Sequence, residues 1–390
     1  MNALDWFLLV LAGVYALSGY WQGFITGACA TAGLLLGGML GVWLAPIALG
    51  DAAPSVWVSL GALLIVITAA SLGQAFLQWT GARVRERITW QPVRAVDALG
   101  GAALSAAAVL LVAWILGLAV SGSRITGLTP LVRSSSVLAT VDSVLPSSAD
   151  RALQSFNDVV GSSFFPRYME PFAPERIVKV PAGDPKVAND PDVVAAEESV
   201  LKVYGYNKCG KGIEGSGFLF AGNRVMTNAH VVAGVEEPEV QVDGRNVPAK
   251  VVHYDPDLDV AVLAAKVARP SLSFSTKVVS KQKIAVLGYP EDGPYDVQTG
   301  RVRSQQPLRS PDIHGSGTVI RDVLSLRALV RPGNSGGPVV DVDGRVVGVV
   351  FAASVSDADT AYALTAEQVE EAARLGTATS RAVDTGDCVG

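Results

Sequence analysis

The chain has 390 residues, more than one ordinary domain contains, so two or more parts are expected. It is 49% hydrophobic and only 17% charged, with a mean hydropathy of +0.35, which is too apolar for a soluble protein unless the apolar residues are concentrated in one region. The net charge of −5 argues against a nucleic-acid-binding protein and against a polybasic membrane-surface protein.

Four long apolar runs fill the first part of the chain. They are Leu4–Tyr20, Phe24–Leu49, Val56–Leu77 and Leu99–Val120. Each approaches or exceeds the roughly 20 residues that a helix needs to cross a bilayer. The first run lacks the basic leading region of a signal peptide, and a second run follows at once. One run could be a buried core helix, but four in succession predict an all-α transmembrane domain over residues 1–122, embedded in the lipid bilayer.

The basic residues predict how these spans are oriented. No Lys or Arg precedes Arg83, and then Arg83, Arg85, Arg87 and Arg94 crowd the loop between the third and fourth runs. Because basic residues in short loops stay cytoplasmic, we expect this loop inside and both termini outside. The part of the chain after the spans is therefore expected in the periplasm or extracytoplasmic space.

Small residues recur along one face of the second and fourth runs. They are Cys29, Gly33, Gly37 and Gly41 in the second run, and Gly101 and Ser105 in the fourth. Such faces let helices approach closely in lipid, where packing drives association. Cys29 is therefore interpreted as a packing residue, and not as a metal ligand or redox partner.

The start of the chain carries a first family resemblance. Asn2-Ala3-Leu4-Asp5, followed by Gly19-Tyr20-Trp21-Gln22-Gly23-Phe24, resembles the colicin V production-type (CvpA-like) membrane domains. That resemblance implies no known chemistry. We interpret these helices as a compact anchor in preference to a transport or sensing unit.

Residues 123–195 are predicted to connect the two halves. Ser147 can cap a short amphipathic helix whose apolar face carries Leu153, Phe156, Val159 and Val160. Beyond it, five prolines stand among charged residues, as in an extended linker. These prolines are Pro171, Pro174, Pro181, Pro185 and Pro191.

From about Ser199 the pattern changes to short apolar strands separated by Gly, Asp, Asn and Pro turns. The runs are Val200–Tyr206, Gly217–Phe220, Val240–Val242, Val251–His253, Val260–Ala264, Ile284–Gly288 and Val346–Ala352. Many short strands at this spacing predict an all-β barrel or sandwich. Residues 196–390 are long enough for two small packed β-barrels.

Three residues of this region form a catalytic constellation. His230 follows an apolar strand, Asp259 begins the buried run Val260-Ala261-Val262, and Ser335 lies among glycines in Pro332-Gly333-Asn334-Ser335-Gly336-Gly337-Pro338. A Gly-rich turn that happens to contain Ser is the simpler interpretation of the last stretch alone. The order His, Asp, Ser along the chain is that of chymotrypsin-type proteases.

The same blocks carry a second resemblance. T-N-A-H, D-V-A-V-L and G-N-S-G-G-P, with Gly215-Ser216-Gly217-Phe218 before the histidine, resemble the trypsin-like serine proteases near the HtrA/DegP branch. With four spans ahead of such a domain, the whole chain resembles the actinobacterial membrane-anchored acid-resistance serine proteases (MarP-like). The resemblance implies a chymotrypsin-like double β-barrel with serine endopeptidase activity.

Roles for these residues follow from the chemistry of acyl transfer. Ser335 is the candidate nucleophile, His230 its general base, and Asp259 the residue that orients the histidine. Asp255 and Asp257 are nearby alternatives, but they lie in a Pro-containing turn. The amides of Gly333 and Ser335 are the candidate oxyanion hole.

Histidine and cysteine usage gives no indication of a metal site or another cofactor. His253 and His314 are the only other histidines, and neither stands in a Cys/His spacing typical of metal ligands. We therefore assign neither residue a role and expect no cofactor.

The substrate is inferred by resemblance. The primary specificity pocket would be built from chain stretches that supply Leu329, Val330, Phe351, Ala353, Ala363 and Leu364. Since none of these is acidic, we expect cleavage after medium or large apolar residues, and not after Arg or Lys. Partners would be protein substrates in the cell envelope, and no nucleic acid; the family implies a part in surviving acid or oxidative stress. Self-cleavage in the Pro-rich linker is a further expectation.

Two alternatives come from other functional classes. One is a catalytically inactive, trypsin-like binding module, against which the presence of His230, Asp259 and Ser335 argues. The other is a functional membrane domain that the protease domain regulates. Spans with almost no ionisable residues argue against a conduction path.

The remaining two cysteines, Cys209 and Cys388, are predicted to form a disulfide. Cys29 lies in a span, and outside the cytoplasm thiols that can meet tend to be oxidised. Two unpaired surface thiols are the alternative. A bridge would pin the C-terminal segment across the first barrel and steady the strands that line the active site.

Overall fold

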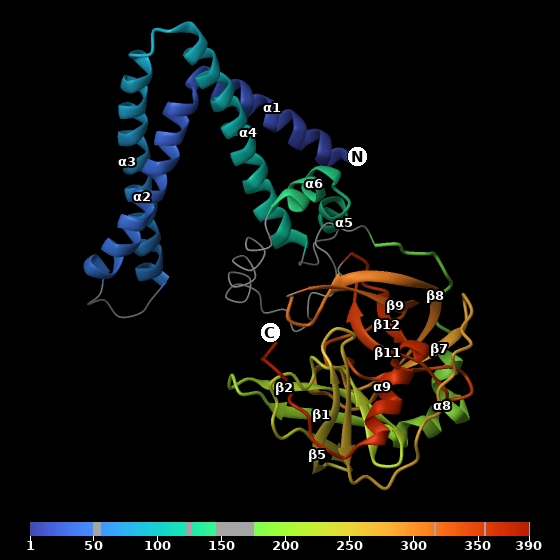
Figure 1. Cartoon of the computed structure of the whole chain (residues 1–390). Coiled ribbons are helices and arrows are strands. Elements are labelled where there is room, and N and C mark those ends of the chain that lie inside the picture. Colours follow the sequence, from blue (N-terminus) through green and yellow to red (C-terminus); the bar gives the residue numbers. More distant parts are fainter. Residues whose placement is uncertain (50–55, 122–126, 146–174, 316, 355, 390) are drawn as a thin grey trace. The chain divides into compact units, whose positions relative to one another are not determined.

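The computed structural model describes residues 1–49, 56–121, 127–145, 175–315, 317–354 and 356–389, which form two compact units (Figure 1). One unit combines Met1–Ala119 with Leu131–Leu145, and the other takes Val120–Pro130 with Pro146–Gly390. Residues 131–145, which the sequence pattern placed in the linker, thus group with the helical unit.

The helical unit is built on four long apolar helices. They are α1 (Ala3–Gln22), α2 (Phe24–Leu49), α3 (Val56–Glu86) and α4 (Gln91–Ser121). The side chain of Asn2 caps α1 by accepting a hydrogen bond from the Asp5 amide at 3.1 Å. All four helices are long and apolar enough to cross a membrane, which confirms the predicted all-α transmembrane class.

Small residues bring these helices together in pairs, as their spacing predicted. A Cβ added to Gly33 of α2 would lie 2.2 Å from the carbonyl oxygen of Gly73 in α3. A Cβ added to Gly81 of α3 would lie 2.7 Å from the Cβ of Cys29, so Cys29 is a packing residue. Gly19 of α1 approaches Gly101 of α4 in the same way, with 2.3 Å between an added Cβ and the Gly101 oxygen.

An ion pair joins all four helices at the basic end of the unit. The Nε of Arg85 in α3 lies 2.7 Å from the Oδ2 of Asp97 in α4. Asp97 Oδ1 accepts a hydrogen bond from the Ile25 amide of α2 at 2.9 Å, and Arg85 also donates to the carbonyl of Trp21 in α1. These contacts of Arg85 and Asp97 add to the helix packing and fix the turn at which α1 passes into α2.

Two short helices, α5 (Leu128–Arg133) and α6 (Ser136–Val144), are additional to the sequence prediction. The buried Asp5 carboxylate of α1 accepts hydrogen bonds from the Ser135 hydroxyl at 2.6 Å and from the Val137 amide at 3.0 Å. A charged side chain therefore anchors α6 to α1. The amphipathic helix expected after Ser147 falls outside the described residues.

The last part of the expected linker is bound to the second unit, which contains the strands. Arg303, Arg327 and Arg301 donate hydrogen bonds to alternate carbonyls, those of Val178, Val180 and Ala182, at 2.6, 2.7 and 3.0 Å. The helical turns η1 (Pro185–Asn189), α8 (Pro191–Ala195) and η2 (Ala196–Ser199) follow. An extended segment outside a sheet has no strand partner for its backbone carbonyls, and here the three arginine side chains donate the hydrogen bonds that these carbonyls need. Residues 175–199 therefore pack as part of this unit.

The strands form two closed antiparallel barrels, which confirms the predicted double β-barrel (Figure 1). In order around the first barrel they are β1 (Val200–Tyr206), β2 (Gly212–Ala221), β3 (Arg224–Thr227), β6 (Val260–Ala265), β5 (Arg245–Asp255) and β4 (Glu239–Val242). In order around the second they are β10 (Pro338–Val340), β11 (Val346–Ala353), β12 (Thr360–Thr365), β9 (Thr318–Arg327), β8 (Asp296–Pro311) and β7 (Lys283–Gly288).

Each barrel has its own apolar interior, and a third cluster joins them. Val203 and Leu263 belong to the first interior, and Leu324 and Val350 to the second. The joining cluster contains Phe218 of the first barrel and Phe351 of the second, with residues of α9 (Ala366–Ala378). The barrels are therefore held against each other by buried apolar surface, and the loops that meet along this junction are fixed from both sides.

Candidate active site

His230 and Asp259 are brought together by two neighbouring strands. His230 follows the end of β3, and Asp259 directly precedes β6, which pairs with β3 through Thr227 and Ala261. The Nδ1 atom of His230 lies 2.8 Å from Oδ2 of Asp259 and 3.0 Å from Oδ1, and the His230 amide donates to Oδ1 at 2.9 Å. The carboxylate side chain is fully buried and the imidazole is 10% exposed.

This contact determines which imidazole nitrogen can act as a base. An ionised carboxylate is only an acceptor, so Nδ1 of His230 carries the proton that lies between it and Asp259. The lone pair is then left on Nε2, on the other side of the ring. A histidine held in this tautomer can remove a proton from a hydroxyl.

The structure distinguishes among the three aspartates that the sequence left open. Asp255 Oδ1 accepts the amides of Asp257 and Leu258 at 3.0 and 2.9 Å, so its carboxylate closes the turn. Asp259 has φ +64, and Asn228 Nδ2 donates to its carbonyl at 2.8 Å. Of these aspartates, Asp259 is the one that contacts His230.

Ser335 lies on a tight loop between β9 and β10. The Gly336 amide donates to the Val350 carbonyl of β11 at 2.8 Å, and the side chain of Ser335 is buried within the loop, at 4% exposure. Gly336 has φ +82, and a Cβ there would lie 2.2 Å from the Ser216 carbonyl oxygen. Only glycine fits this position, because it combines a left-handed backbone with a close approach to β2.

The serine loop lies against the part of the first barrel that carries the histidine. The Ser216 amide donates to the Ser335 carbonyl at 2.8 Å. A Cβ added to Gly215 would lie 3.1 Å from that carbonyl oxygen and 2.7 Å from the side chain of Val231, which follows His230. The nucleophile candidate and the base candidate are thus held on opposite barrels at one junction.

The backbone around Ser335 also presents two donors. Among the residues that the structure describes, the amides of Gly333 and Ser335 donate to no acceptor. Gly333 has φ +91, a conformation available to glycine at little cost. Two unengaged amides beside a serine hydroxyl can stabilise an oxyanion, so the oxyanion hole stays a prediction that this geometry allows.

The residues expected to line the substrate pocket are distributed over different surroundings. Val330, Ala353 and Ala363 pack with the interior of the second barrel, and Phe351 and Leu364 with the cluster that joins the barrels. Leu329 is 38% exposed. Successive residues of a strand point to opposite faces, so Ala363 and Leu364 cannot both face one pocket. The apolar pocket therefore stays a prediction.

Two residues near the site had no assigned role in the sequence. The Asn228 side chain donates a hydrogen bond to the Asp259 carbonyl. In the sequence, this residue was indicated by its position two residues before the histidine in T-N-A-H. Ser216, in Gly215-Ser216-Gly217-Phe218, donates through its hydroxyl to the Gly333 carbonyl at 2.6 Å. A contact between positions so far apart in the chain has no local sequence signature.

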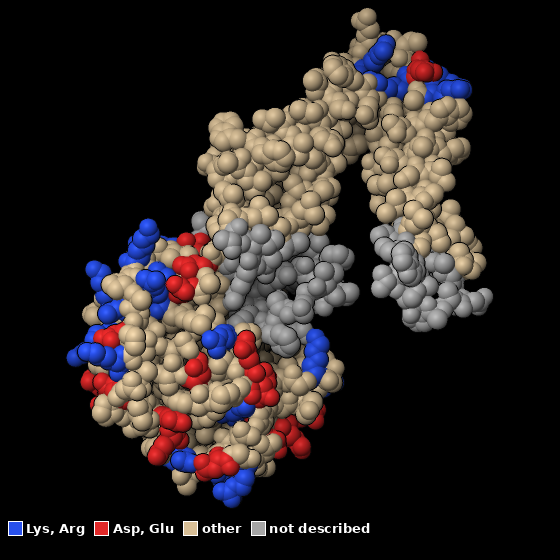
Figure 2. Space-filling model, turned by 180° about the vertical axis from the view of Figure 1, so that it is seen from behind, with Lys and Arg blue, Asp and Glu red and all other residues tan. Residues whose placement is uncertain are grey.

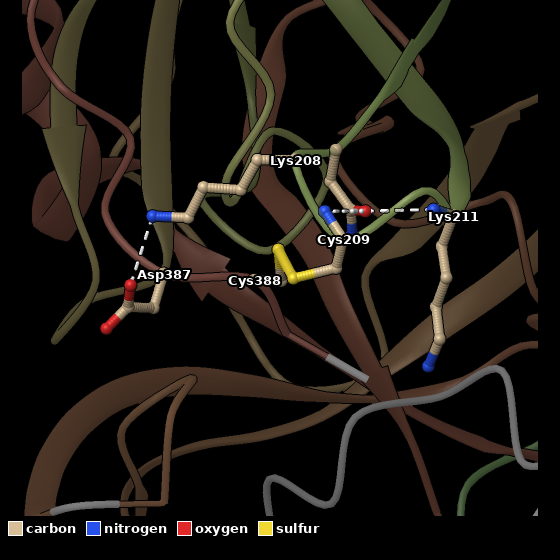
Figure 3. The surroundings of a disulfide bond; sticks show 6 residues. Lys208, Cys209, Lys211, Asp387 and Cys388 are labelled. Carbon is tan, nitrogen blue, oxygen red and sulfur yellow. Dashed lines mark hydrogen bonds and ion pairs between the residues drawn. A yellow bond between two sulfur atoms is a disulfide. The ribbon is translucent and has the colours of Figure 1, made fainter.

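The structure confirms the predicted pairing of Cys209 with Cys388, whose Cα atoms are 6.5 Å apart (Figure 3). Beside the bridge, Lys208 Nζ lies 3.0 Å from Asp387 Oδ1. The Gly234 amide donates to the Thr385 carbonyl at 3.1 Å. The C-terminal segment is thus fixed to the first barrel next to the loop that follows His230.

Comparison with known families divides the chain as its structure does. Residues 4–146 match the family described as colicin V production protein. Residues 215–349 match the family described as trypsin-like peptidase domain.

The chain is similar over almost its whole length to a serine protease of Mycobacterium tuberculosis strain H37Rv, Rv3671c. The two are 35% identical over 392 residues, which cover 99% of this chain and 98% of the relative. The crystal structure of the Rv3671c protease in its active form is 41% identical, with a TM-score of 0.54, and covers 57% of this chain and 99% of that one. The chloroplastic Protease Do-like 1 of Arabidopsis thaliana is 32% identical over 142 residues, 35% of this chain and 32% of that protein.

Proposed function

Because the chain belongs to the family of the Mycobacterium tuberculosis serine protease Rv3671c, and is itself a serine protease, we propose that it cleaves proteins outside the cytoplasm with a triad of His230, Asp259 and Ser335. The observation that carries this proposal is the double contact of His230 Nδ1 with the buried Asp259 carboxylate, at 2.8 and 3.0 Å, beside the glycine-flanked Ser335 loop.

Each residue then has a defined step. His230 Nε2 takes the proton of the Ser335 hydroxyl as its oxygen attacks the peptide carbonyl, and later gives that proton to the leaving amine. Asp259 keeps the imidazole in the required tautomer and stabilises the imidazolium that forms. The amides of Gly333 and Ser335 stabilise the negative oxygen of the tetrahedral intermediate. In the second half of the reaction, water takes the place of the serine hydroxyl: His230 removes a proton from the water as it attacks the acyl-enzyme, and Ser335 is released with that proton as the product acid leaves.

The charge distribution of the helical unit supports an extracytoplasmic protease. Figure 2 shows basic side chains gathered at one end of the helical unit. The end of α3 and the start of α4 carry Arg83, Arg85 and Arg94, whereas Arg133 is buried in α5. Basic loops stay in the cytoplasm, and α4 then leads the chain to the other side. The disulfide between Cys209 and Cys388 fits an oxidising compartment.

The substrates that we propose are proteins of the cell envelope, cleaved after apolar residues, in a response to acid or oxidative stress. The location argues for envelope proteins, and the resemblance to acid-resistance proteases argues for stress. Self-cleavage in the linker belongs to the same proposal. No observation favours the alternatives of an inactive binding module or of a helical unit as the functional part.

A fluorophosphonate probe tests the proposed chemistry. It phosphonylates an activated serine, so the full chain in detergent should be labelled, and the label should disappear in Ser335→Ala. Ser325→Ala is a control, since Ser325 is also buried but lies on β9. An unlabelled wild type, or a Ser335→Ala variant that keeps the label, would overturn the proposed triad.

A further inference from the structure

Gly333, the proposed oxyanion donor, has nothing of its own to hold its amide in place. With no Cβ, both peptide groups that flank it can rotate at little cost. A half-turn of the group between Pro332 and Gly333 would replace the N–H at the oxyanion position by a carbonyl oxygen. The donor therefore depends on whatever fixes these two peptide groups.

One of the two groups is fixed by a turn of the second barrel. The Glu291 amide donates to the Pro332 carbonyl at 2.7 Å. This carbonyl belongs to the same planar group as the Gly333 N–H and points the opposite way, so holding one directs the other. Glu291 lies in the turn η3 (Pro290–Asp292), where Glu291 and Asp292 have φ +55 and +53.

The other group is fixed by Ser216 of the first barrel. The Ser216 hydroxyl lies 2.6 Å from the Gly333 carbonyl oxygen and 2.9 Å from the Tyr289 amide nitrogen. An amide can only donate, so the Ser216 oxygen accepts from Tyr289 and its proton goes to Gly333. In neither hydrogen bond can the donor and the acceptor exchange roles, so the Ser216 hydroxyl determines the direction in which the Gly333 carbonyl points.

Ser216 is itself held without freedom to move. It is fully buried, its amide donates to Ser335 at 2.8 Å, and its carbonyl accepts from the Thr227 hydroxyl at 2.8 Å. A Cβ added to Gly288 would lie 2.7 Å from the Ser216 hydroxyl oxygen, so the pocket around the hydroxyl is closed.

We propose that Ser216 is a positioning residue for the oxyanion hole, which acts through Gly333 and the Tyr289 turn and touches neither His230 nor the substrate. The proposal rests on the proposed function of Ser335 and Gly333. It makes the oxyanion donor dependent on the docking of the two barrels, because the hydroxyl comes from one barrel and both of its partners from the other.

The test compares Ser216→Ala with Ser199→Ala in the full chain. Ser199 is a matched control, because it is 1% exposed and donates to the Pro270 carbonyl at 2.9 Å, away from the serine loop. Ser216→Ala removes the two hydrogen bonds of one buried hydroxyl, and Ser199→Ala removes one, so the melting temperature of each variant is measured beside its labelling rate. Fluorophosphonate labelling is measured against probe concentration, which separates the maximal rate from the half-saturating concentration.

In Ser216→Ala the maximal labelling rate should fall about 10- to 100-fold, up to the loss typical of one oxyanion donor, with a half-saturating concentration within about twofold. The pH at half-maximal rate should stay that of wild type, since the hydroxyl's hydrogen bonds reach neither His230 nor Asp259. Ser199→Ala should label at the wild-type rate.

Equal maximal rates in the two variants would overturn the proposal. So would a shifted pH profile in Ser216→Ala, which would indicate a disturbed His230 instead. If Ser216→Ala does not fold, Ser216→Cys keeps a donor at this position, although a larger and weaker S–H one, and the same selective fall in maximal rate is expected. Labelling that survives Ser335→Ala is a different result, because it removes the proposed function itself.

Discussion

At the scale of single residues, Asp259, the proposed partner of His230, combines two properties that stability alone would not favour. Its carboxylate is fully buried, and its φ is +64, a region that non-glycine residues seldom occupy. The Asn228 side chain and the start of β6 hold it there. We propose that this backbone conformation aims the carboxylate at His230, whereas the Asp255 carboxylate closes a turn.

Replacing Asp259 by Asn should therefore remove activity without removing the fold. An amide donates towards His230 and favours the wrong tautomer, so kcat should fall by about 10⁴-fold. Peptide hydrolysis by the purified chain measures this, with Asp255→Asn as the control, expected within about twofold of wild type. Comparable losses in the two variants would argue against Asp259 as the partner of His230.

His253 gives the protease unit a dependence on pH. Burial lowers the pKa of His253 below its ordinary value of 6.5, although Asp255 and Glu371 act to raise it. The unfolded chain then binds more protons than the folded one in the window below pH 6.5, so stability falls as pH drops through it. His253→Gln should flatten this part of the curve of melting temperature against pH. An unchanged curve would assign the pH dependence to other groups.

At the scale of elements, the apolar strands were the predictable part. Val200–Tyr206 was predicted with its observed bounds, because it is rich in the β-branched, apolar and aromatic residues that are typical of strands. The β8–β9 hairpin was missed, since Asp296–Pro311 is largely polar and its outer half carries few apolar residues. β9 ends at Arg327, where the chain turns into the serine loop.

The proposed catalytic residues could be selected from the sequence, whereas the contacts that orient them could not. Short blocks of sequence carry His230, Asp259 and Ser335, because each needs particular neighbours in the chain. The contacts of Ser216 with Gly333, and of Arg303 with Val178, join residues more than a hundred positions apart. Such contacts depend on how the strands close into barrels, and a local sequence pattern does not predict that closure.

Arg303 should be what keeps the segment before η1 on the barrel. Its side chain is 5% exposed, donates to the Val178 carbonyl and lies 3.4 Å from Asp357. In Arg303→Met the segment should detach more often, and trypsin should cut after Lys179 about 10-fold faster, the effect of losing a buried charged hydrogen bond. The exposed Arg381 supplies the control, Arg381→Met. Identical cleavage rates in both would mean that Arg303 does not retain the segment.

At the scale of the whole molecule, one chain combines an apolar helical unit with a disulfide-closed protease unit. The bridge spans 179 positions and encloses every strand from β2 to β12, with β1 just before it. The chain-entropy model assigns such a loop about 5 kcal/mol, as an upper figure. Since the tail lies beside the loop after His230, stability and activity are expected to change together.

Cys209→Ser should lower the melting temperature of the protease unit by up to about 15 °C, and reduce activity at the same time. Cys388→Ser should behave alike, and the double variant should be no worse than either, since each loses the same bond. Cys29→Ser is the control, because Cys29 lies in α2. Additive losses in the double variant would show that the effects do not come from the bridge.

The central claim is an active serine protease on the outer side of the membrane, and one measurement addresses both parts. Intact cells that produce the full chain are treated with a membrane-impermeant fluorophosphonate, and the labelled peptide is identified by mass spectrometry. The label should be found on Ser335, and both Ser335→Ala and Asp259→Asn should lose it. Labelling that requires lysis of the cells would contradict the orientation, and a label on another residue, or none, would contradict the catalytic assignment.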